Sequence, residues 1–159
     1  MSVTINGSGQ IPVQIQTTTL TSQFSTTSAT FTNVTGLSIS ITPTNASNKI
    51  LIMVSMFLGT SNSSLASWAL TRNGSLINIG TGGSTLNTTG TFYTEVGSSA
   101  SNSSVAPGTI YLDSPATTSA VTYQIQLANS GGTAYVNRRG SGSDFTGPST
   151  IVVMEIAYA

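Results

Sequence analysis

Hydrophobic residues recur at every second position along much of this chain, which is the period of a β-strand with one buried face. Such alternation occurs at 12–16, 37–42, 66–71 and 121–128. Turn-forming residues separate these segments at intervals of roughly 8–12 residues, and no window shows apolar residues at helical spacing. The pattern therefore predicts an all-β protein of about eight to ten short strands.

Segment 49–58 departs from this pattern, because most of its ten residues are apolar without alternation. It is too short for a membrane helix of about 20 residues, so it predicts a central strand covered on both faces. In an oligomer, one face would lie in the core and the other against a neighbouring subunit. The last strand, 150–158, is also apolar on nearly both sides and is expected inside a sheet or an interface.

Two turn signals predict how strands are connected. Asn73-Gly74 between apolar segments is a strong hairpin signal. Pro43 and the polar residues 44–48 lead from the strand at 37–42 into segment 49–58, and we expect these two strands to be antiparallel neighbours.

The chain has 159 residues, which fits one domain with a substantial core. Residues 1–20 are predicted to form an N-terminal arm or edge strand, and residues 21–159 an antiparallel β-sandwich. Long connections between strands favour a two-sheet jelly roll. In the arm, the residues expected to bind a partner are Val3, Ile5, Val13 and Ile15.

Charged residues make up only 5% of the chain, and four cations balance four acids. No strong field attracts nucleic acid or a charged membrane, so neither nucleic-acid binding nor membrane insertion is expected. A chain with net charge near zero has little colloidal repulsion, which favours a closed oligomer or an assembled particle.

The chain contains neither His nor Cys. This excludes the Ser-His-Asp triad, cysteine nucleophiles and His- or Cys-bearing zinc sites, and no cofactor or metal is expected. Paired carboxylates could still hydrolyse glycans. The candidates are Glu95, Asp113, Asp144 and Glu155, although we expect the protein not to be an enzyme.

Two other groups of residues are candidates for ligand or inter-subunit contacts. Arg138 and Arg139 adjoin the Gly-rich stretch 140–147 and could bind a carboxylate or phosphate, pair with Asp144, or bridge subunits. Phe92 and Tyr93 lie in the loop-rich middle of the chain and could stack on a sugar. Trp68, Tyr111, Tyr123 and Tyr135 could also stack on a sugar, but Trp68, Tyr111 and Tyr123 fit core or interface packing better.

Segments 24–52, 112–127, 134–138 and 149–156 resemble a β-domain of tailed-phage virion proteins, common among cyanophage and marine phages and often placed at the ends of tail fibres. The most specific matches are the turn Asp113-Ser114-Pro115 and the terminal Met154-Glu155-Ile156. Segment 69–75, followed by an apolar strand, is also similar to jelly rolls of the C1q and tumour-necrosis-factor kind, which implies a homotrimer.

The resemblance implies a virion protein assembled in the host cytoplasm, with two hypotheses for its role. Because only a short arm precedes the domain, the first is a trimeric capsid decoration (cement) protein that stabilises the capsid without covalent bonds. Its partners would be other copies of itself and the major capsid protein or another virion protein. The alternative is a receptor-binding head of a tail fibre or tail tip that recognises a host surface glycan.

Overall fold

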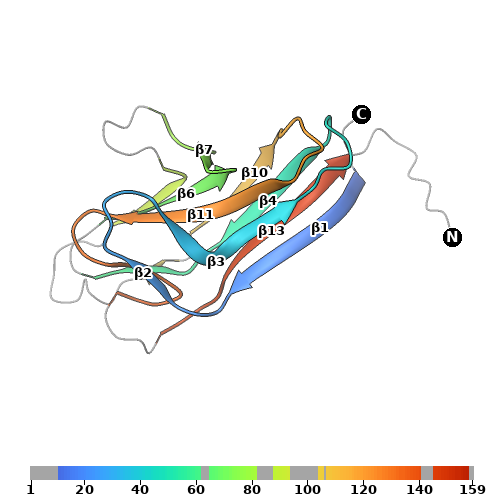
Figure 1. Cartoon of the computed structure of the whole chain (residues 1–159). Coiled ribbons are helices and arrows are strands. Elements are labelled where there is room, and N and C mark those ends of the chain that lie inside the picture. The colour runs from blue at the N-terminus through green and yellow to red at the C-terminus, as the bar shows by residue number, and fades with distance from the viewer. Residues whose placement is uncertain are drawn as a thin grey trace.

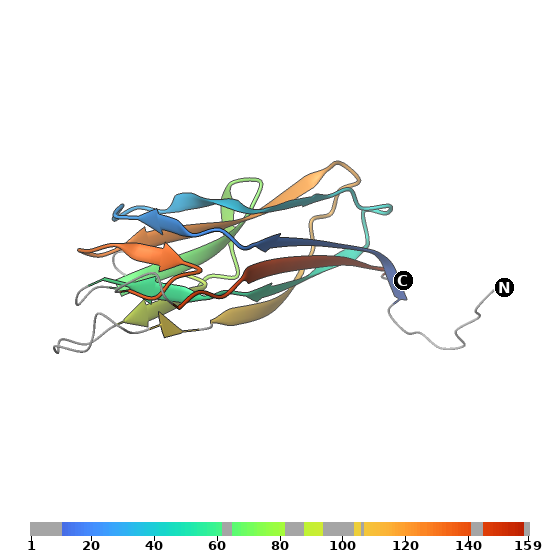
Figure 2. The same ribbon diagram turned by 90° about the horizontal axis from the view of Figure 1, so that it is seen from below.

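The computed structural model describes residues 11–61, 65–81, 88–93, 104–105, 107–140 and 145–157. These residues form thirteen β-strands and no helix, so the prediction of an all-β protein is confirmed. Figures 1 and 2 show an elongated molecule whose strands run along its long axis. In chain order the strands are β1 (Ile11–Leu20), β2 (Phe24–Thr26), β3 (Thr32–Ile41), β4 (Lys49–Ser55), β5 (Leu58–Thr60), β6 (Leu65–Arg72), β7 (Ser75–Ile77), β8 (Gly90–Tyr93), β9 (Ser104–Val105), β10 (Gly108–Asp113), β11 (Val121–Asn129), β12 (Ala134–Val136) and β13 (Ser149–Ala157).

The strands form two layers of antiparallel sheet. One sheet has the order β1-β13-β4-β10, and the opposite sheet has the order β3-β11-β6-β7, with β8 also paired to β6. A shorter sheet has the order β2-β12-β5-β9. Its strands are the neighbours along the chain of β1, β13, β4 and β10, respectively, so they are arranged in the same order as in the first sheet. It therefore prolongs the first layer, and the described residues form an antiparallel β-sandwich.

The order in which strands pair is nested along the chain. The first strand pairs with the last, β3 with β11, β4 with β10, and β6 with β7. Ile11 consequently lies opposite Ala157, so the described ends of the chain meet at one edge of the sandwich.

The prediction that 37–42 and 49–58 are neighbours in one sheet is wrong. The first segment forms most of β3, which pairs with β11, whereas β4 pairs with β13 and β10 in the opposite sheet. Pro43 and the polar turn end β3 as expected, and the chain then crosses between sheets. A turn signal of this kind specifies where a strand stops but not whether the next strand returns beside it.

The core lies between the two sheets. Residues 121, 123, 125 and 127 of β11 are buried, while their polar neighbours face outward, as the alternation predicts. Trp68 and Tyr123 are the largest fully buried side chains of the described residues. The Asn73-Gly74 hairpin between β6 and β7 is also confirmed, and both residues adopt positive φ (49° and 84°), as a tight two-residue turn requires.

Segment 49–58 is divided between two strands. Its first part, β4, lies inside the first sheet and alternates between buried and half-buried residues, whereas Met56 and Phe57 interrupt pairing before β5. A long strand covered on both faces within one chain is β6, in which every residue from Ala66 to Thr71 is buried, and the three residues of the short β5 are buried as well. The outer face of β4 therefore carries apolar side chains that the chain itself covers only in part.

Candidate assembly face

The outer face of the sheet β1-β13-β4-β10 is apolar across all four strands. Ile110, Met53 and Val152 lie side by side in one cross-strand row, and the next row along the strands contains Leu112, Leu51, Met154 and Ile15. Residues in register on neighbouring strands share a face of the sheet, and the inward positions of β4 are occupied by buried Ile50, Ile52 and Val54. The first row continues into the polar, exposed Thr17 on β1, and we call the seven apolar residues of these two rows the assembly face.

Several side chains of the assembly face are strongly exposed. Ile110 is 74% exposed, Ile15 58% and Leu112 43%, whereas the residues on β4 and β13 are half-buried. Val13, at a register shift in β1, is 45% exposed beside them. Contiguous exposed apolar residues of this kind mark interaction sites, in contrast to single exposed side chains.

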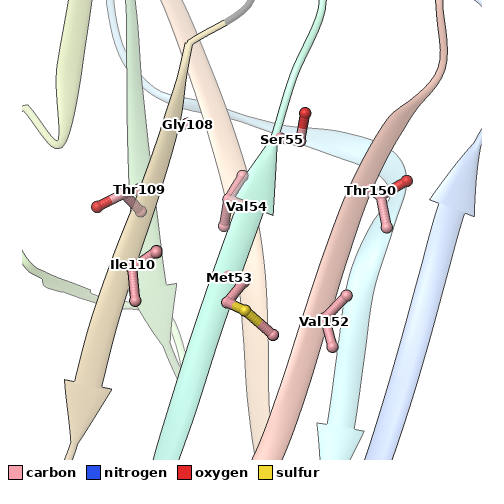
Figure 3. A pocket seen from close by; sticks show the side chains of 8 residues that line it. All are labelled: Met53, Val54, Ser55, Gly108, Thr109, Ile110, Thr150 and Val152. Carbon is pink, nitrogen blue, oxygen red and sulfur yellow. The ribbon is translucent and has the colours of Figure 1, made fainter.

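A hollow lies at one end of the assembly face. Gly108, Ser55 and Thr150 form a row of small residues next to the row of Ile110, and together these rows line a cavity of about 640 Å³ (Figure 3). The small row leaves space because Gly108 has no side chain and those of Ser55 and Thr150 are short. The face therefore presents a projecting side chain beside a depression.

No residue of the assembly face is charged. Lys49, at the start of β4, donates a hydrogen bond from Nζ to Ser114 Oγ (2.7 Å). The acidic residues of these strands, Asp113 and Glu155, alternate with the outward positions and are buried. The face is thus suited to close packing against another apolar surface, without a charge to desolvate.

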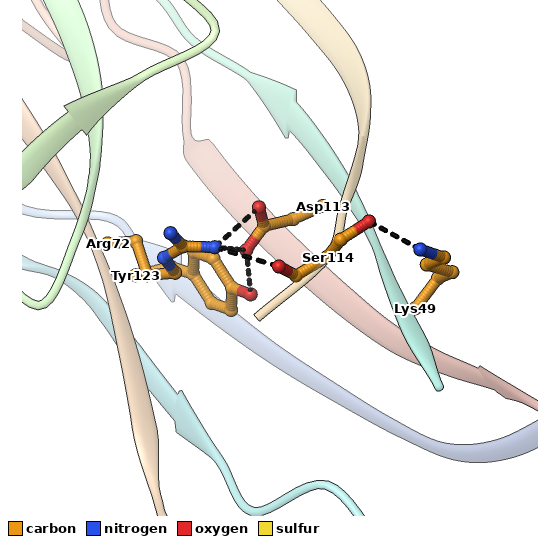
Figure 4. Close-up of polar contacts among 5 residues, drawn as sticks. All are labelled: Lys49, Arg72, Asp113, Ser114 and Tyr123. Carbon is orange, nitrogen blue, oxygen red and sulfur yellow. Dashed lines mark hydrogen bonds and ion pairs between the residues drawn. The ribbon is translucent and has the colours of Figure 1, made fainter. Parts of the chain in front are cut away.

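Asp113 fixes the end of β10 from inside the sandwich. Arg72 Nη1 contacts both carboxylate oxygens (2.9 and 3.0 Å), and the Tyr123 hydroxyl donates to Oδ2 (2.7 Å), as Figure 4 shows. Burial, and then the hydrogen bond to Asp113, raise the pKa of Tyr123 well above its usual range, so the hydroxyl stays a donor. Because Arg72 and Tyr123 belong to the opposite sheet, this cluster ties the two layers together at the end of β10.

Glu155 fixes the other edge of the same sheet. Its carboxylate accepts hydrogen bonds from Gln14 Nε2 (2.6 Å), Thr44 N (2.7 Å), Thr44 Oγ1 (2.8 Å) and Asn48 Nδ2 (2.7 Å). Burial alone would raise the pKa of Glu155, but these donors outweigh it and lower the pKa to about 2. The Gln14 contact holds β1 against β13 and thereby positions Val13 and Ile15.

The structure separates the other residues that the sequence singled out. Arg138 lies over the Tyr135 ring (4.3 Å to the centroid) and Arg139 over the Phe145 ring (4.8 Å), so both guanidinium groups pack on aromatic faces. Phe92 and Tyr93 belong to β8, whose backbone pairs with β6 in the opposite sheet. The two arginines instead follow β12, so the arginine pair and the aromatic pair lie on different parts of the fold. Of the remaining predicted residues, Val13 and Ile15 are on β1, and Val3, Ile5 and Asp144 lie outside the described residues.

The sequence pointed to one face of 49–58 and to the strand 150–158 as interface segments, which include Met53 and Val152, but it indicated no site at Ile110 or Leu112. A signal was present, because 110–112 and 151–154 contain consecutive apolar residues that cannot all face one core. Periodicity identifies such an excess but leaves open which of the two sides the core occupies. The opposite sheet and the inward clusters of Asp113 and Glu155 decide this in the folded chain.

The candidate catalytic carboxylates that can be placed are in the interior. Asp113 is 3% exposed and Glu155 is fully buried, and both are hydrogen-bonded to protein groups, whereas Glu95 and Asp144 lie outside the described residues. Among the described residues, no group of three or more His, Cys, Asp or Glu is placed to hold a metal ion. The same part of the chain contains no helix with the length and apolar character needed to cross a membrane.

Comparison of the chain with models of protein families and with curated proteins gave no match.

Proposed function

We propose that the protein is a bacteriophage virion structural protein, a trimeric decoration protein that binds the outside of the capsid and stabilises it without covalent bonds. The observation that carries this proposal is the assembly face, which is apolar, uncharged and four strands wide. Burying apolar surface contributes roughly 25 cal/mol per Å², so such a face is a source of assembly energy. The virion setting follows the resemblance of the sequence to tailed-phage β-domains.

The nested strand pairing supports a jelly roll as the finer description of the fold. In a jelly roll the first strand pairs with the last and successive pairs lie inside one another across two sheets. The pairs β1-β13, β3-β11, β4-β10 and β6-β7 follow this order. Jelly-roll domains occur in viral capsid proteins, but a fold alone does not assign a function. The fold therefore supports the proposal only together with the face.

The edge strand β1 supports a second contact, to the capsid. It lies at the end of its sheet and carries no charged residue, and a long uncharged edge can accept a further strand. In the proposed particle, copies of the chain cover one another's assembly faces, and the edge of β1 with the preceding residues 1–10 contacts a capsid protein.

Co-sedimentation with empty capsids of the phage that encodes the protein tests this function. The full chain should sediment with capsids in many copies per particle, and it should raise the temperature at which they rupture. A chain lacking residues 1–10, which keeps β1 intact, should remain assembled but should no longer bind. Failure of the full chain to bind would exclude the decoration role, and undiminished binding of the shortened chain would exclude the arm as the anchor.

A polar hollow on the opposite sheet favours receptor binding as a second candidate function. It has a volume of about 250 Å³ and is lined by Asn33, Thr71, Asn73, Gly74, Thr122 and Gln124. Uncharged amides and hydroxyls are groups that hydrogen-bond sugar hydroxyls. Under this alternative, purified protein should block phage adsorption to host cells, whereas a decoration protein should not.

A further inference from the structure

Ile110 is the most exposed large hydrophobic residue of the described chain. It lies on the edge strand β10, and the inward residues on either side of it are Thr109 and Tyr111. Thr109 Oγ1 accepts a hydrogen bond from Asn78 Nδ2 (2.9 Å), and Tyr111 packs against the core. Farther along the strand, Asp113 is held by Arg72 and Tyr123. The backbone that presents Ile110 is therefore fixed, and little conformational freedom is lost when its side chain is buried.

The hollow beside Ile110 is maintained by the backbone itself. A Cβ atom on Gly108 would lie 2.5 Å from the carbonyl oxygen of Val54 on the paired strand, so no side chain fits there without movement of β10. Ser55, in register with Gly108, is exposed, and Thr150 in the same row is half-buried. The backbone at Gly108 thus keeps this end of the face free of a side chain, and the hollow is part of the larger depression that Ile110, Met53 and Val152 also line.

We infer that a second copy of this chain covers the assembly face, with Ile110 of one copy inserted into the hollow formed by Gly108, Ser55 and Thr150 of the other. In a closed trimer each copy contacts the next one head to tail, so every copy must offer both a projecting part and a matching hollow. A projecting residue and a hollow on adjacent rows of one face meet this requirement. The inference rests on the proposed assembly function and specifies its contact.

The charge distribution favours a second copy over other occupants. When identical faces meet, like charges oppose each other, and the assembly face has none. A lipid surface would instead be expected to require basic residues around the apolar patch. The four described strands of this sheet contain a single basic residue, Lys49, which does not form such a ring of basic residues.

The test uses the full chain and four proteins. Ile110→Asp places a charge on the projecting residue, and Ser55→Trp fills the hollow; both positions are exposed, so the fold should tolerate each change. Leu76→Asp is the matched control, because Leu76 is an exposed apolar residue (38%) on β7 of the opposite sheet. Mass is measured by light scattering and sedimentation, and the fold by circular dichroism and thermal melting.

The wild type and Leu76→Asp should have a mass several times 16.2 kDa, whereas Ile110→Asp and Ser55→Trp should fall to 16.2 kDa. Both monomeric variants should keep the circular dichroism spectrum and a cooperative melting transition, at a lower temperature because assembly no longer stabilises the fold. A monomeric wild type, or an Ile110→Asp protein with the wild-type mass, would overturn the inference. Flotation of a monomeric wild type with lipid vesicles, either phosphatidylcholine alone or mixed with phosphatidylserine, would assign the face to lipid and also overturn it. Capsid binding is measured separately. If Ile110→Asp loses assembly, the contact between copies is supported even when the wild type binds no capsid. If a monomeric wild type binds capsids, the contact between copies is overturned, while the decoration role stands.

Discussion

Asp113 and Glu155 lie on either side of Ile50, each in register with it from a neighbouring strand. Both carboxylates are buried, but they are satisfied differently, since Asp113 pairs with Arg72 and Glu155 accepts hydrogen bonds from neutral groups such as Gln14. Asp113 thereby fixes β10 and Glu155 fixes β1. The two edge strands of the assembly face are each held from inside the sandwich by one acidic residue.

Replacing Glu155 with Gln should lower the free energy of unfolding by about 1–3 kcal/mol at pH 7. The carboxylate accepts hydrogen bonds from Gln14, Thr44 and Asn48. The side-chain amide NH₂ of a glutamine is itself a donor and would face at least one of these donors. Urea unfolding at pH 7 measures the effect. An unfolding free energy equal to that of the wild type would show that the cluster rearranges without cost.

The contribution of Glu155 should also depend on pH. Its pKa is lowered from 4.5 to about 2 in the folded chain, so the stabilisation is complete above pH 4.5 and is lost as the pH falls towards 2. The shift corresponds to roughly 3 kcal/mol. The difference in unfolding free energy between the wild type and Glu155→Gln should therefore shrink across this window, which urea titrations at several pH values measure. A difference that stays constant from pH 7 to 2 would contradict the assignment.

The Tyr123 hydroxyl should contribute to stability through Asp113. Tyr123→Phe removes a buried donor from the carboxylate and should cost about 1–2 kcal/mol of unfolding free energy. Tyr111→Phe is the control, because the Tyr111 hydroxyl makes no hydrogen bond within the described part of the chain. In an Asp113→Ala background the Tyr123→Phe change should cost less, since its acceptor is gone. Equal costs in both backgrounds would exclude the coupling.

Local chemistry made the strands and the main hairpin predictable. Val121, Tyr123, Ile125 and Leu127 alternate with polar residues, and only an extended strand places all four in one core. The hairpin follows from Asn73-Gly74, because few other pairs adopt positive φ at both positions so readily. Both features depend on residues close together in the sequence.

The arrangement of sheets and the candidate face could not be predicted in the same way. Whether Pro43 leads back into the same sheet or across to the other depends on contacts with β11 and β13, which are far along the chain. The exposure of Ile110 depends on its place at an edge strand and on the inward cluster of Asp113. An apolar residue in alternation shows that one side is buried, whereas the opposite sheet determines which side that is.

Adding one methyl group at Gly108 should disturb both the fold and the assembly face. In Gly108→Ala the new Cβ would lie 2.5 Å from the carbonyl oxygen of Val54, a backbone atom that moves only with its strand. Because β10 must then shift, the unfolding free energy should fall by about 1–3 kcal/mol. The change also narrows the hollow, so the oligomer should dissociate at higher protein concentrations than the wild type. Gly80→Ala is the control, since its Cβ meets nothing within 4 Å and its backbone is outside the left-handed region. Thermal melting and light scattering measure the two effects, and wild-type values of both for Gly108→Ala would show that β10 adjusts freely and does not define the hollow.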